Sequence, residues 1–243
     1  MNNPVKQDTV FYLTPEHDCS YLPNRLSMTI VIDPSLRITS DSYSKLAAQG
    51  FRRSGKFIYR PCCRTCKACI PVRIPVHRFE LTRQFRRIRR INEDLTVTVL
   101  PVEYREDHFD LYKRYLSAQH AGGGMDDPAP EDYHGFLCSV SMNSIFMEFR
   151  QAKKLVAVAV TDQMPDALSA VYTFYEPAER RRSPGTHAIL HQIEYARNSG
   201  LDWLYLGYWI AESRKMNYKS RFRPLQYLIN GKWQENAPEK AKD

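Results

Sequence analysis

Apolar positions recur along the chain with two different periods, and together these predict a mixed fold. Short apolar runs and runs that alternate with polar residues predict strands. The predicted strands are 57–60, 70–76, 96–102, 145–150, 155–161, 168–175 and 201–207. Apolar residues that return every three or four positions predict helices at 41–50, from 81 onward, around 109–119, around 132–140 and at 186–198. We therefore expect an α/β (α+β) protein without internal repeats.

The second half of the chain contains a strand–loop–helix–strand unit over 168–207. Its loop, EPAERRRSPGTH, leads into the helix, and Gly200 is placed to end that helix. We expect a small N-terminal domain over 1–80 that holds most of the cysteines, and a larger domain over 81–243. In the larger domain, 81–140 is expected to be helical and 144–235 to form a mixed sheet. The loop AGGGMDDPAP, at 121–130, is the clearest hinge-like segment.

The composition is that of a globular protein with a sizeable core. Of 243 residues, 43% are hydrophobic and 12% are aromatic. The start, MNNPVKQDTVFYL, lacks a basic stretch followed by an apolar core, and the longest aliphatic run, 155–160, is too short to cross a bilayer. We therefore expect a cytoplasmic protein without a membrane partner.

Four of the six cysteines fall within eight residues, in the run RPCCRTCKACIPV. The spacing C-x-x-C-x-x-C lets one tight turn aim thiolates at a soft metal ion or an iron–sulfur cluster. In the cytosol, such clusters are more often metal-binding or redox-active than disulfide-bonded. The candidate ligands of zinc or a cluster are Cys62, Cys63, Cys66 and Cys69, with Cys19 as a remote further ligand. The alternative is a reduced structural cluster.

The net charge of +8 favours an anionic partner. In LTRQFRRIRRINEDL, the apolar residues follow one helical stripe and five arginines point largely elsewhere. The apolar positions are Leu81, Phe85, Ile88 and Leu95, and the arginines are Arg83, Arg86, Arg87, Arg89 and Arg90. We favour a phosphate-backbone contact surface over a merely solvated helix face. Such a surface carries no sequence specificity by itself.

A second basic run, RRRSPGTH, stands at a predicted helix start. Arg180, Arg181 and Arg182 precede Gly185, where free backbone amides and the helix dipole attract phosphate. Coenzyme-A acyltransferases of the GNAT fold hold pyrophosphate at this topological position. Their full R-x-x-G-x-G motif is absent here, and a surface loop with a helix cap is the alternative.

Motifs for several other chemistries are missing. There is no P-loop, kinase glycine motif or Rossmann glycine pattern, and no G-x-S-x-G or H-E-x-x-H sequence. Readings as a hydrolase, a dehydrogenase or an ATP-dependent enzyme therefore have no support.

Five segments, in one order, resemble the arginyl/leucyl-tRNA–protein transferase family of the N-degron pathway. They are CSYLPNR at 19–25, GFRRSGKFIYRPCCRTCKACIPVRI at 50–74, VYTFYEP at 171–177, SPGTHAILHQIEYAR at 183–197 and LYLGYWIAESRKMNYKSRFRPLQYL at 204–228. The compact length and the YRPCC run resemble the bacterial leucyltransferase branch more than the longer eukaryotic arginyltransferases.

The resemblance implies transfer of leucine from leucyl-tRNA to the α-amino group of proteins that begin with Asp or Glu, which marks them for degradation. It implies a family-specific N-terminal domain followed by a GNAT-like acyltransferase domain, no cofactor for the transfer, and no DNA partner. Eukaryotic members can hold an iron–sulfur cluster through an early C-x-x-C pair and a later Cys-Cys pair. Here the early pair is broken, because Leu22 stands where its second cysteine would be.

Within the matched segments, an acidic acceptor calls for an arginine or a lysine, best a bidentate arginine. We expect Arg60 first, and we expect Gly207 and Tyr208 to align the ester carbonyl. The predicted substrate-binding residues are Arg53, Arg60, Tyr175, Gly207, Tyr208, Lys215, Tyr218 and Lys219, and the predicted tRNA-binding residues are Arg83, Arg86, Arg87, Arg90, Arg180, Arg181 and Arg182. We assign no catalytic base, because an α-amine with a pKa of about 7.7–8.0 is already partly nucleophilic near neutral pH.

Three other functions stay open from the residues alone. The donor could be arginyl-tRNA with the same acceptors. A non-catalytic RNA-binding module would explain the charge and the cysteines but not the ordered match at 171–228. A coenzyme-A acetyltransferase would explain the strand–helix–strand unit but not the cysteine block.

Overall fold

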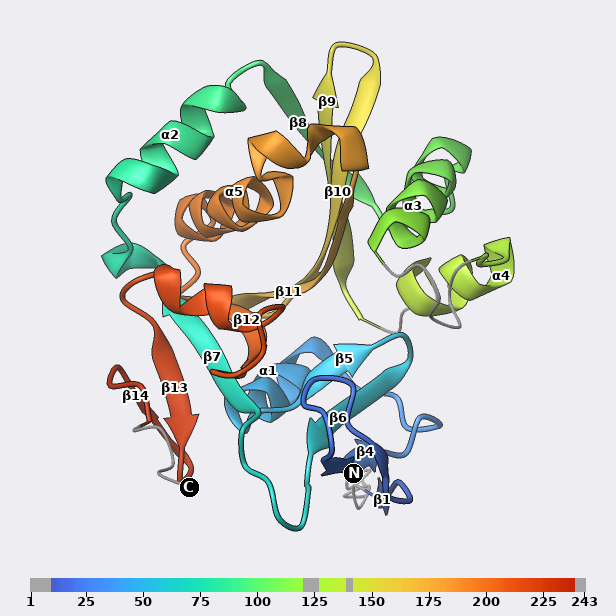
Figure 1. The fold of residues 1–243 in the computed structure, drawn as a ribbon, viewed down its shortest axis with the longest axis vertical. Coiled ribbons are helices and arrows are strands. Elements are labelled where there is room, and N and C mark those ends of the chain that lie inside the picture. Colours follow the sequence, from blue (N-terminus) through green and yellow to red (C-terminus); the bar gives the residue numbers. More distant parts are fainter. Residues whose placement is uncertain (1–9, 120–126, 139–141, 239–243) are drawn as a thin grey trace, which may run out of the picture.

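A computed structural model describes residues 10–119, 127–138 and 142–238. Its centre is an eight-stranded sheet with the order β14-β13-β7-β12-β11-β10-β9-β8 (Figure 1). Every neighbouring pair is antiparallel except β11 and β12. The strands are β7 (Ile70–Pro75), β8 (Leu95–Pro101), β9 (Ser144–Gln151), β10 (Lys154–Gln163), β11 (Ala167–Tyr175), β12 (Trp203–Trp209), β13 (Gln226–Ile229) and β14 (Lys232–Gln234). The predicted mixed α/β class is confirmed.

Helices cover both faces of this sheet (Figure 1). On one face, α2 (Arg83–Ile91) and α5 (Pro184–Asn198) bury Phe85, Ile88 and Ile193 against the strands. On the other face, α3 (Glu106–Gln119), the short α4 (Pro130–Tyr133) and the π-helical turn η2 (His134–Cys138) pack over β9 to β11. Short 3-10 turns are η1 (Val76–Arg78), η3 (Pro177–Arg182) and η4 (Asn217–Arg221). No helix within the described ranges is long and apolar enough to span a membrane.

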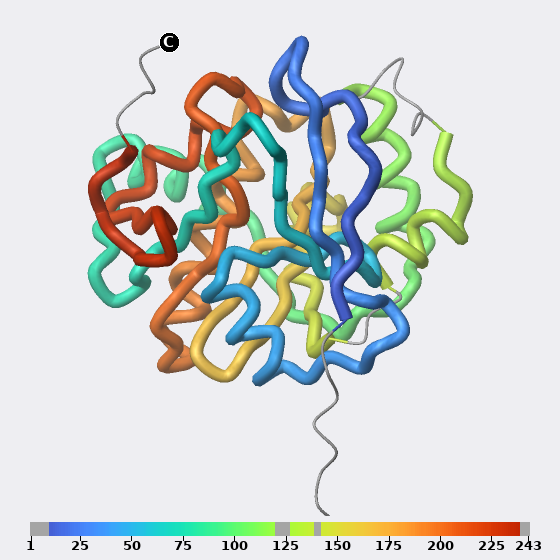
Figure 2. The backbone as a smooth tube through the Cα atoms, turned by 90° about the horizontal axis from the view of Figure 1, so that it is seen from below, coloured from blue at the N-terminus to red at the C-terminus, as the bar shows by residue number. Residues whose placement is uncertain are grey.

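The N-terminal part forms a smaller unit, which lies below the main sheet in Figure 1 and is seen from that side, in blue, in Figure 2. It is a four-stranded antiparallel sheet with the order β1-β4-β6-β5 and one helix, α1. Their bounds are β1 (Phe11–Leu13), β4 (Thr29–Ile32), α1 (Ser40–Ala48), β5 (Arg52–Ser54) and β6 (Phe57–Pro61), and a ribbon of β2 (His17–Asp18) and β3 (Leu26–Ser27) precedes β4. A third core cluster, with Tyr43, Phe51 and Tyr205, joins this unit to the main sheet.

The strand β7 links the two parts of the chain. It precedes residue 81 but lies between β13 and β12 in the main sheet. The predicted boundary at residue 80 therefore does not coincide with a boundary between sheets. A long-range antiparallel pairing of this kind leaves no mark in local periodicity.

Local elements follow the sequence patterns with small shifts. The helix predicted at 41–50 is α1, which starts one residue earlier, because the cap is Thr39, whose hydroxyl accepts from the amide of Ser42. The helix predicted at 132–140 is the pair α4 and η2, and its last two residues lie outside the described ranges. Most of the predicted hinge-like loop at 121–130 also lies outside them.

Candidate functional site

The two parallel strands β11 and β12 separate shortly after they meet. They pair only from Ala167 to Ser169 with Trp203 to Tyr205. Beyond that point each strand carries a bulge: Val171 has no register partner on β10, and Leu206 has none on β7. Because a bulge bends its strand, two bulges at one level open a gap between the strands. We call the space between β11 from Ala170 onward and β12 from Leu206 onward the fork.

Arg52 of β5 fills the closed end of the fork. Its Nη2 donates to the carbonyl oxygens of Ala170 at 2.5 Å and Val171 at 2.9 Å. Its guanidinium lies where a side chain at Gly207 would project, so a Cβ at that position would overlap it. Gly207 also has φ +79°, a conformation that other residues rarely adopt. The Arg52 guanidinium can therefore occupy the closed end of the fork only because residue 207 is a glycine.

Lys219 of η4 lies beside Arg52 on the β12 side. Its Nζ donates to the carbonyl oxygen of Tyr208 at 2.5 Å and is 3.4 Å from Sδ of Met216. Only 5% of Lys219 is exposed. Burial, and then the charge of Arg52, lower the pKa of Lys219 well below its ordinary value. Within the described ranges, no carboxylate forms an ion pair with either cation.

Aromatic residues line the way out of the fork. The rings of Tyr115 and Tyr175 meet edge to face, with centroids 4.9 Å apart. Burial, and then the nearby Tyr175 and Tyr218, raise the pKa of Tyr115. A Cβ added to Gly185 would lie 3.9 Å from the Tyr175 ring. The fork therefore leads, past three tyrosines, toward the start of α5.

The structure gives other predicted substrate residues partners within the protein. Arg53 forms a buried ion pair with Asp162 on β10. Its side chain therefore lies on the opposite face of β5 from Arg52 and does not reach the fork. Arg60 donates to the carbonyl oxygen of Gln49 at 2.9 Å, and its guanidinium lies 4.8 Å from the centre of the Phe51 ring. The Tyr208 hydroxyl donates to the carbonyl oxygen of Gly50, so it holds the small unit in place. Of the remaining predicted residues, Lys215 is exposed and Tyr175, Gly207, Tyr218 and Lys219 surround the fork.

Arg52 is the residue that the sequence analysis missed. It lies in the quoted segment GFRRSGKF, next to Arg53. Alternation in a strand sends neighbouring side chains to opposite faces, so one of the two arginines had to point away from the other. Only the packing of β5 against the main sheet decides which one reaches the fork.

The predicted tRNA-binding arginines fall into two neighbouring groups. Arg83, Arg86, Arg87 and Arg90 are exposed on α2, and Arg180 and Arg181 are exposed on η3. The end of η3 contacts the end of α2, because the Asn92 side chain donates to the carbonyl oxygen of Arg182 at 2.9 Å. We call these six exposed arginines the basic surface. The part of the basic surface on η3 follows the end of β11, which borders the fork.

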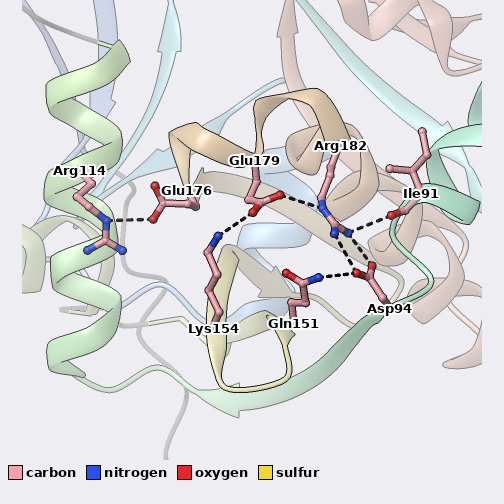
Figure 3. Close-up of polar contacts among 8 residues, drawn as sticks. All are labelled: Ile91, Asp94, Arg114, Gln151, Lys154, Glu176, Glu179 and Arg182. Carbon is pink, nitrogen blue, oxygen red and sulfur yellow. Dashed lines mark hydrogen bonds and ion pairs between the residues drawn. The ribbon is translucent and has the colours of Figure 1, made fainter.

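Arg182 differs from its two neighbours. Its guanidinium is held by Asp94, Glu179 and the carbonyl oxygen of Ile91, and Glu179 also binds Lys154 (Figure 3). Asp94 accepts a further hydrogen bond from Gln151. These contacts fix η3 between α2 and the β9–β10 hairpin. The geometry gives Arg182 a structural role in presenting Arg180 and Arg181.

The loop between β6 and β7, with Cys19 beside it, brings four thiols close together. Burial, and then the nearby Cys63, Cys19 and Cys66, raise the pKa of Cys69 to about 12. Cys62 is exposed, and all six cysteines are unpaired. Nowhere in the described ranges do three His, Cys, Asp or Glu side chains form a group that could hold a metal ion. A raised thiol pKa also disfavours the thiolate form that binds metals.

Comparison with known proteins covers nearly the whole chain. Residues 17–87 match the family model described as arginine-tRNA-protein transferase, N terminus, and residues 107–229 match arginine-tRNA-protein transferase, C terminus. The aspartate/glutamate leucyltransferase of Hahella chejuensis is 48% identical over 224 residues, 92% of this chain and 96% of the relative. That of Thiobacillus denitrificans is 48% identical over 231 residues, 95% of this chain and 96% of the relative. That of Pseudomonas putida is 49% identical over 223 residues, 92% of this chain and 95% of the relative.

Among solved structures, FemX matches with a TM-score of 0.46 and 11% identity, covering 72% of this chain and 61% of its own. L-PGS from Bacillus licheniformis also matches with a TM-score of 0.46 and 11% identity, covering 63% of this chain and 49% of its own.

Proposed function

This chain belongs to the arginine-tRNA-protein transferase family, and within it we propose transfer of leucine from leucyl-tRNA to the N-terminal α-amino group of proteins that begin with Asp or Glu. The observation that carries the proposal is the identity of 48–49%, over more than nine-tenths of the chain, to relatives named aspartate/glutamate leucyltransferase. The donor is a charged tRNA, so the proposal places the reaction in the cytoplasm.

The reaction needs positioning more than activation. The α-amino nitrogen of the acceptor attacks the carbonyl carbon of the leucyl ester, an amide bond forms, and the ester bond to the terminal ribose breaks. The ribose hydroxyl leaves with a proton, and the amine loses one. Because the ester is already activated and part of the amine is unprotonated near neutral pH, holding the two groups together supplies much of the rate. The absence of nucleotide-binding motifs in the sequence agrees with this chemistry.

The fork is the site we propose for this step. It is a gap between two strands of a rigid sheet, so backbone groups of β11 and β12 can align an acyl group without reorganising. The tyrosines at its mouth, Tyr115, Tyr175 and Tyr218, offer an apolar lining for leucine and the terminal base of the tRNA. No side chain is assigned as a catalytic base.

The basic surface is the tRNA-binding region we propose. Its six exposed arginines lie on α2 and η3, and η3 directly follows Tyr175 at the fork. A tRNA that places its 3′ end in the fork would therefore lay its backbone phosphates along these arginines. Such contacts depend on charge rather than on base sequence.

Metal binding at the cysteines stays a separate prediction. Soft thiolate ligands suit zinc or an iron–sulfur cluster, yet the thiols of Cys19, Cys63, Cys66 and Cys69 are not arranged as a ligand group. No step of the proposed transfer runs through a metal. Stoichiometric zinc or iron in the purified protein, with its loss in Cys66→Ser and Cys69→Ser, would support the prediction, and metal-free active protein would contradict it.

The proposal is tested by a matrix of donors and acceptors. Purified protein receives tRNA charged with labelled leucine or labelled arginine, and peptides that begin with Asp, Glu, Arg or Ala. We expect leucine on the Asp and Glu peptides alone. Arginine on the same peptides would show that the chain is an arginyltransferase instead. Binding of tRNA without any transfer would favour a non-catalytic RNA-binding module.

A further inference from the structure

We propose that Arg52 and Lys219 together bind the side-chain carboxylate of the acceptor's first residue and thereby select Asp and Glu. The identity of the acceptor rests on the proposed function. The location rests on the contacts of the two cations with the fork. The assignment replaces Arg60, which the sequence alone favoured for this role.

The two cations share a small space. The Arg52 guanidinium lies against Gly207, and the Lys219 ammonium is bonded to the carbonyl oxygen of the next residue, Tyr208. Their mutual repulsion is one cause of the low pKa of Lys219. Two like charges brought together in a partly buried site cost free energy unless an anion joins them.

The described part of the chain supplies no such anion. Within the described ranges, neither cation has an ion-pair partner, whereas Arg53, one residue away, is fully paired with Asp162. The polar groups around the cations are backbone carbonyls, the hydroxyls of Tyr59, Tyr208 and Tyr218, and the thiol of Cys69. Burial, and then the nearby cysteines, raise the pKa of Cys69 to about 12, so this thiol is also uncharged. An unneutralised pair at a substrate site is the arrangement expected for an anionic substrate group.

Among the described residues, one nitrogen of Arg52 also lacks a hydrogen-bond partner. Nη2 is satisfied by two carbonyls, but Nη1 is buried and unpartnered among the described residues. A cavity beside it, lined by Gly50, Ser169 and Gly207, has room for a single water molecule at most. A substrate carboxylate must therefore approach from the open side of the fork, where Arg52 and Gly207 retain some exposure.

This geometry explains why the carboxylate and the reaction lie close together. The α-amino nitrogen is three bonds from the side-chain carboxylate carbon in Asp and four in Glu. A carboxylate held by Arg52 and Lys219 would thus hold the amine beside the bulges at Ala170–Val171 and Leu206–Gly207. Asparagine and glutamine have the same shapes without the charge, so they would leave both cations unpaired.

The experiment measures acceptor binding separately from transfer. Fluorescently labelled peptides that begin with Asp or with Asn, otherwise identical, are titrated with wild-type protein, Arg52→Met, Lys219→Met, Arg60→Ala and Lys45→Met. Lys45 is an exposed lysine on α1, and its variant is the control for loss of one positive charge. Thermal unfolding identifies any variant that fails to fold. If Arg52→Met fails to fold, Lys219→Met still tests the inference.

We expect wild-type protein to prefer the Asp peptide by about 100-fold, which corresponds to loss of one desolvated charge pair. Lys219→Met and Arg52→Met should abolish the preference by weakening the Asp peptide alone, and Lys45→Met should keep it. Loss of the preference in Arg60→Ala, with Lys219→Met unchanged, would overturn the inference. Equal binding of both peptides by wild-type protein would overturn it as well.

The same proteins are then assayed for leucine transfer. Selective Asp binding that depends on Lys219, without transfer from leucyl-tRNA, would contradict the proposed function and support the inference. Leucine transfer to Asp peptides that is unaffected by Lys219→Met would support the proposed function and contradict the inference.

Discussion

The guanidinium of Arg53 is bound edge-on by the carboxylate of Asp162, with two hydrogen bonds of 2.8 Å each. Arg53 belongs to β5 of the small sheet and Asp162 to β10 of the main sheet, and both side chains are almost completely buried. Ser144 donates a further hydrogen bond of 2.6 Å to the same carboxylate. This pair fixes β5 on the main sheet and so delivers Arg52, the residue before Arg53, to the fork.

Arg53→Met should therefore destabilise the protein strongly, because it leaves the Asp162 carboxylate buried without its cation. Breaking a buried pair in this way costs about 3–5 kcal/mol. Denaturant unfolding measures the loss. The double variant Arg53→Met with Asp162→Leu should be less destabilised than Arg53→Met alone, since no unpaired charge remains. A double variant that is less stable than Arg53→Met would contradict this account.

The basic surface predicts a specific change in salt dependence. Replacing Arg86, Arg87 and Arg90 by Ala should weaken tRNA binding and reduce the slope of log affinity against log salt by roughly two units, because each lost phosphate contact removes about 0.7–0.9. Titrations of tRNA at several salt concentrations measure the slope. Arg78→Ala, which removes an exposed arginine paired with Glu235, is the control and should keep the slope. An unaltered slope in the triple variant would exclude α2 as a tRNA-binding element.

Arg182→Ala should act on stability instead. Its loss leaves Asp94 and Glu179 without the guanidinium that binds both, and it frees the carbonyl oxygen of Ile91. The Arg182 and Glu179 side chains are 19% exposed and Asp94 is 40% exposed, so water reaches part of the network and we expect a decrease of about 1 kcal/mol in the free energy of unfolding. Arg181→Ala, at an exposed position, should leave stability unchanged and weaken tRNA binding. The reverse pattern would show that the roles of the two arginines are exchanged.

His187 predicts how stability depends on pH. Burial, and then the charge of His191, lower the pKa of His187 to about 4, and its Nδ1 has no partner among the described residues. The unfolded chain, with an ordinary histidine pKa of about 6.5, binds the proton more tightly, so the contribution of His187 to stability is lost as pH falls from about 6.5 to about 4.

The measurement is the free energy of unfolding from pH 7 to pH 4 for wild-type protein and His187→Gln. The wild type should lose up to about 3 kcal/mol more than the variant over that range. His17→Gln, at an exposed position, is the control and should follow the wild type. Parallel curves for wild type and His187→Gln would contradict the buried, neutral state of His187.

The sequence predicted most strands of the main sheet because each is an apolar or alternating run. It predicted the helices that cover the sheet because their apolar residues recur every three or four positions. It also identified Gly207, Tyr175, Tyr218 and Lys219, which surround the fork. It did not identify Arg52, because adjacent arginines on a strand look alike until the strand is packed. Nor could it separate Arg182 from Arg180 and Arg181, because the partners Asp94 and Glu179 lie on different elements. The place of β7 beside β12 depends on a pairing between residues 128 to 139 positions apart, which local patterns do not record.

Gly207 offers the most direct test of the central claim, that leucine is transferred to Asp- and Glu-initiated acceptors at the fork. A Cβ at Gly207 would displace the Arg52 guanidinium and disturb the level at which β11 and β12 part. The measurement is transfer of labelled leucine from leucyl-tRNA to an Asp-initiated peptide by wild-type protein and by Gly207→Ala. We predict transfer by the wild type and a rate lower by about 100-fold in the folded variant, the loss typical of a misplaced reacting group. Equal rates for the two proteins, or no leucine transfer by the wild type, would contradict the claim.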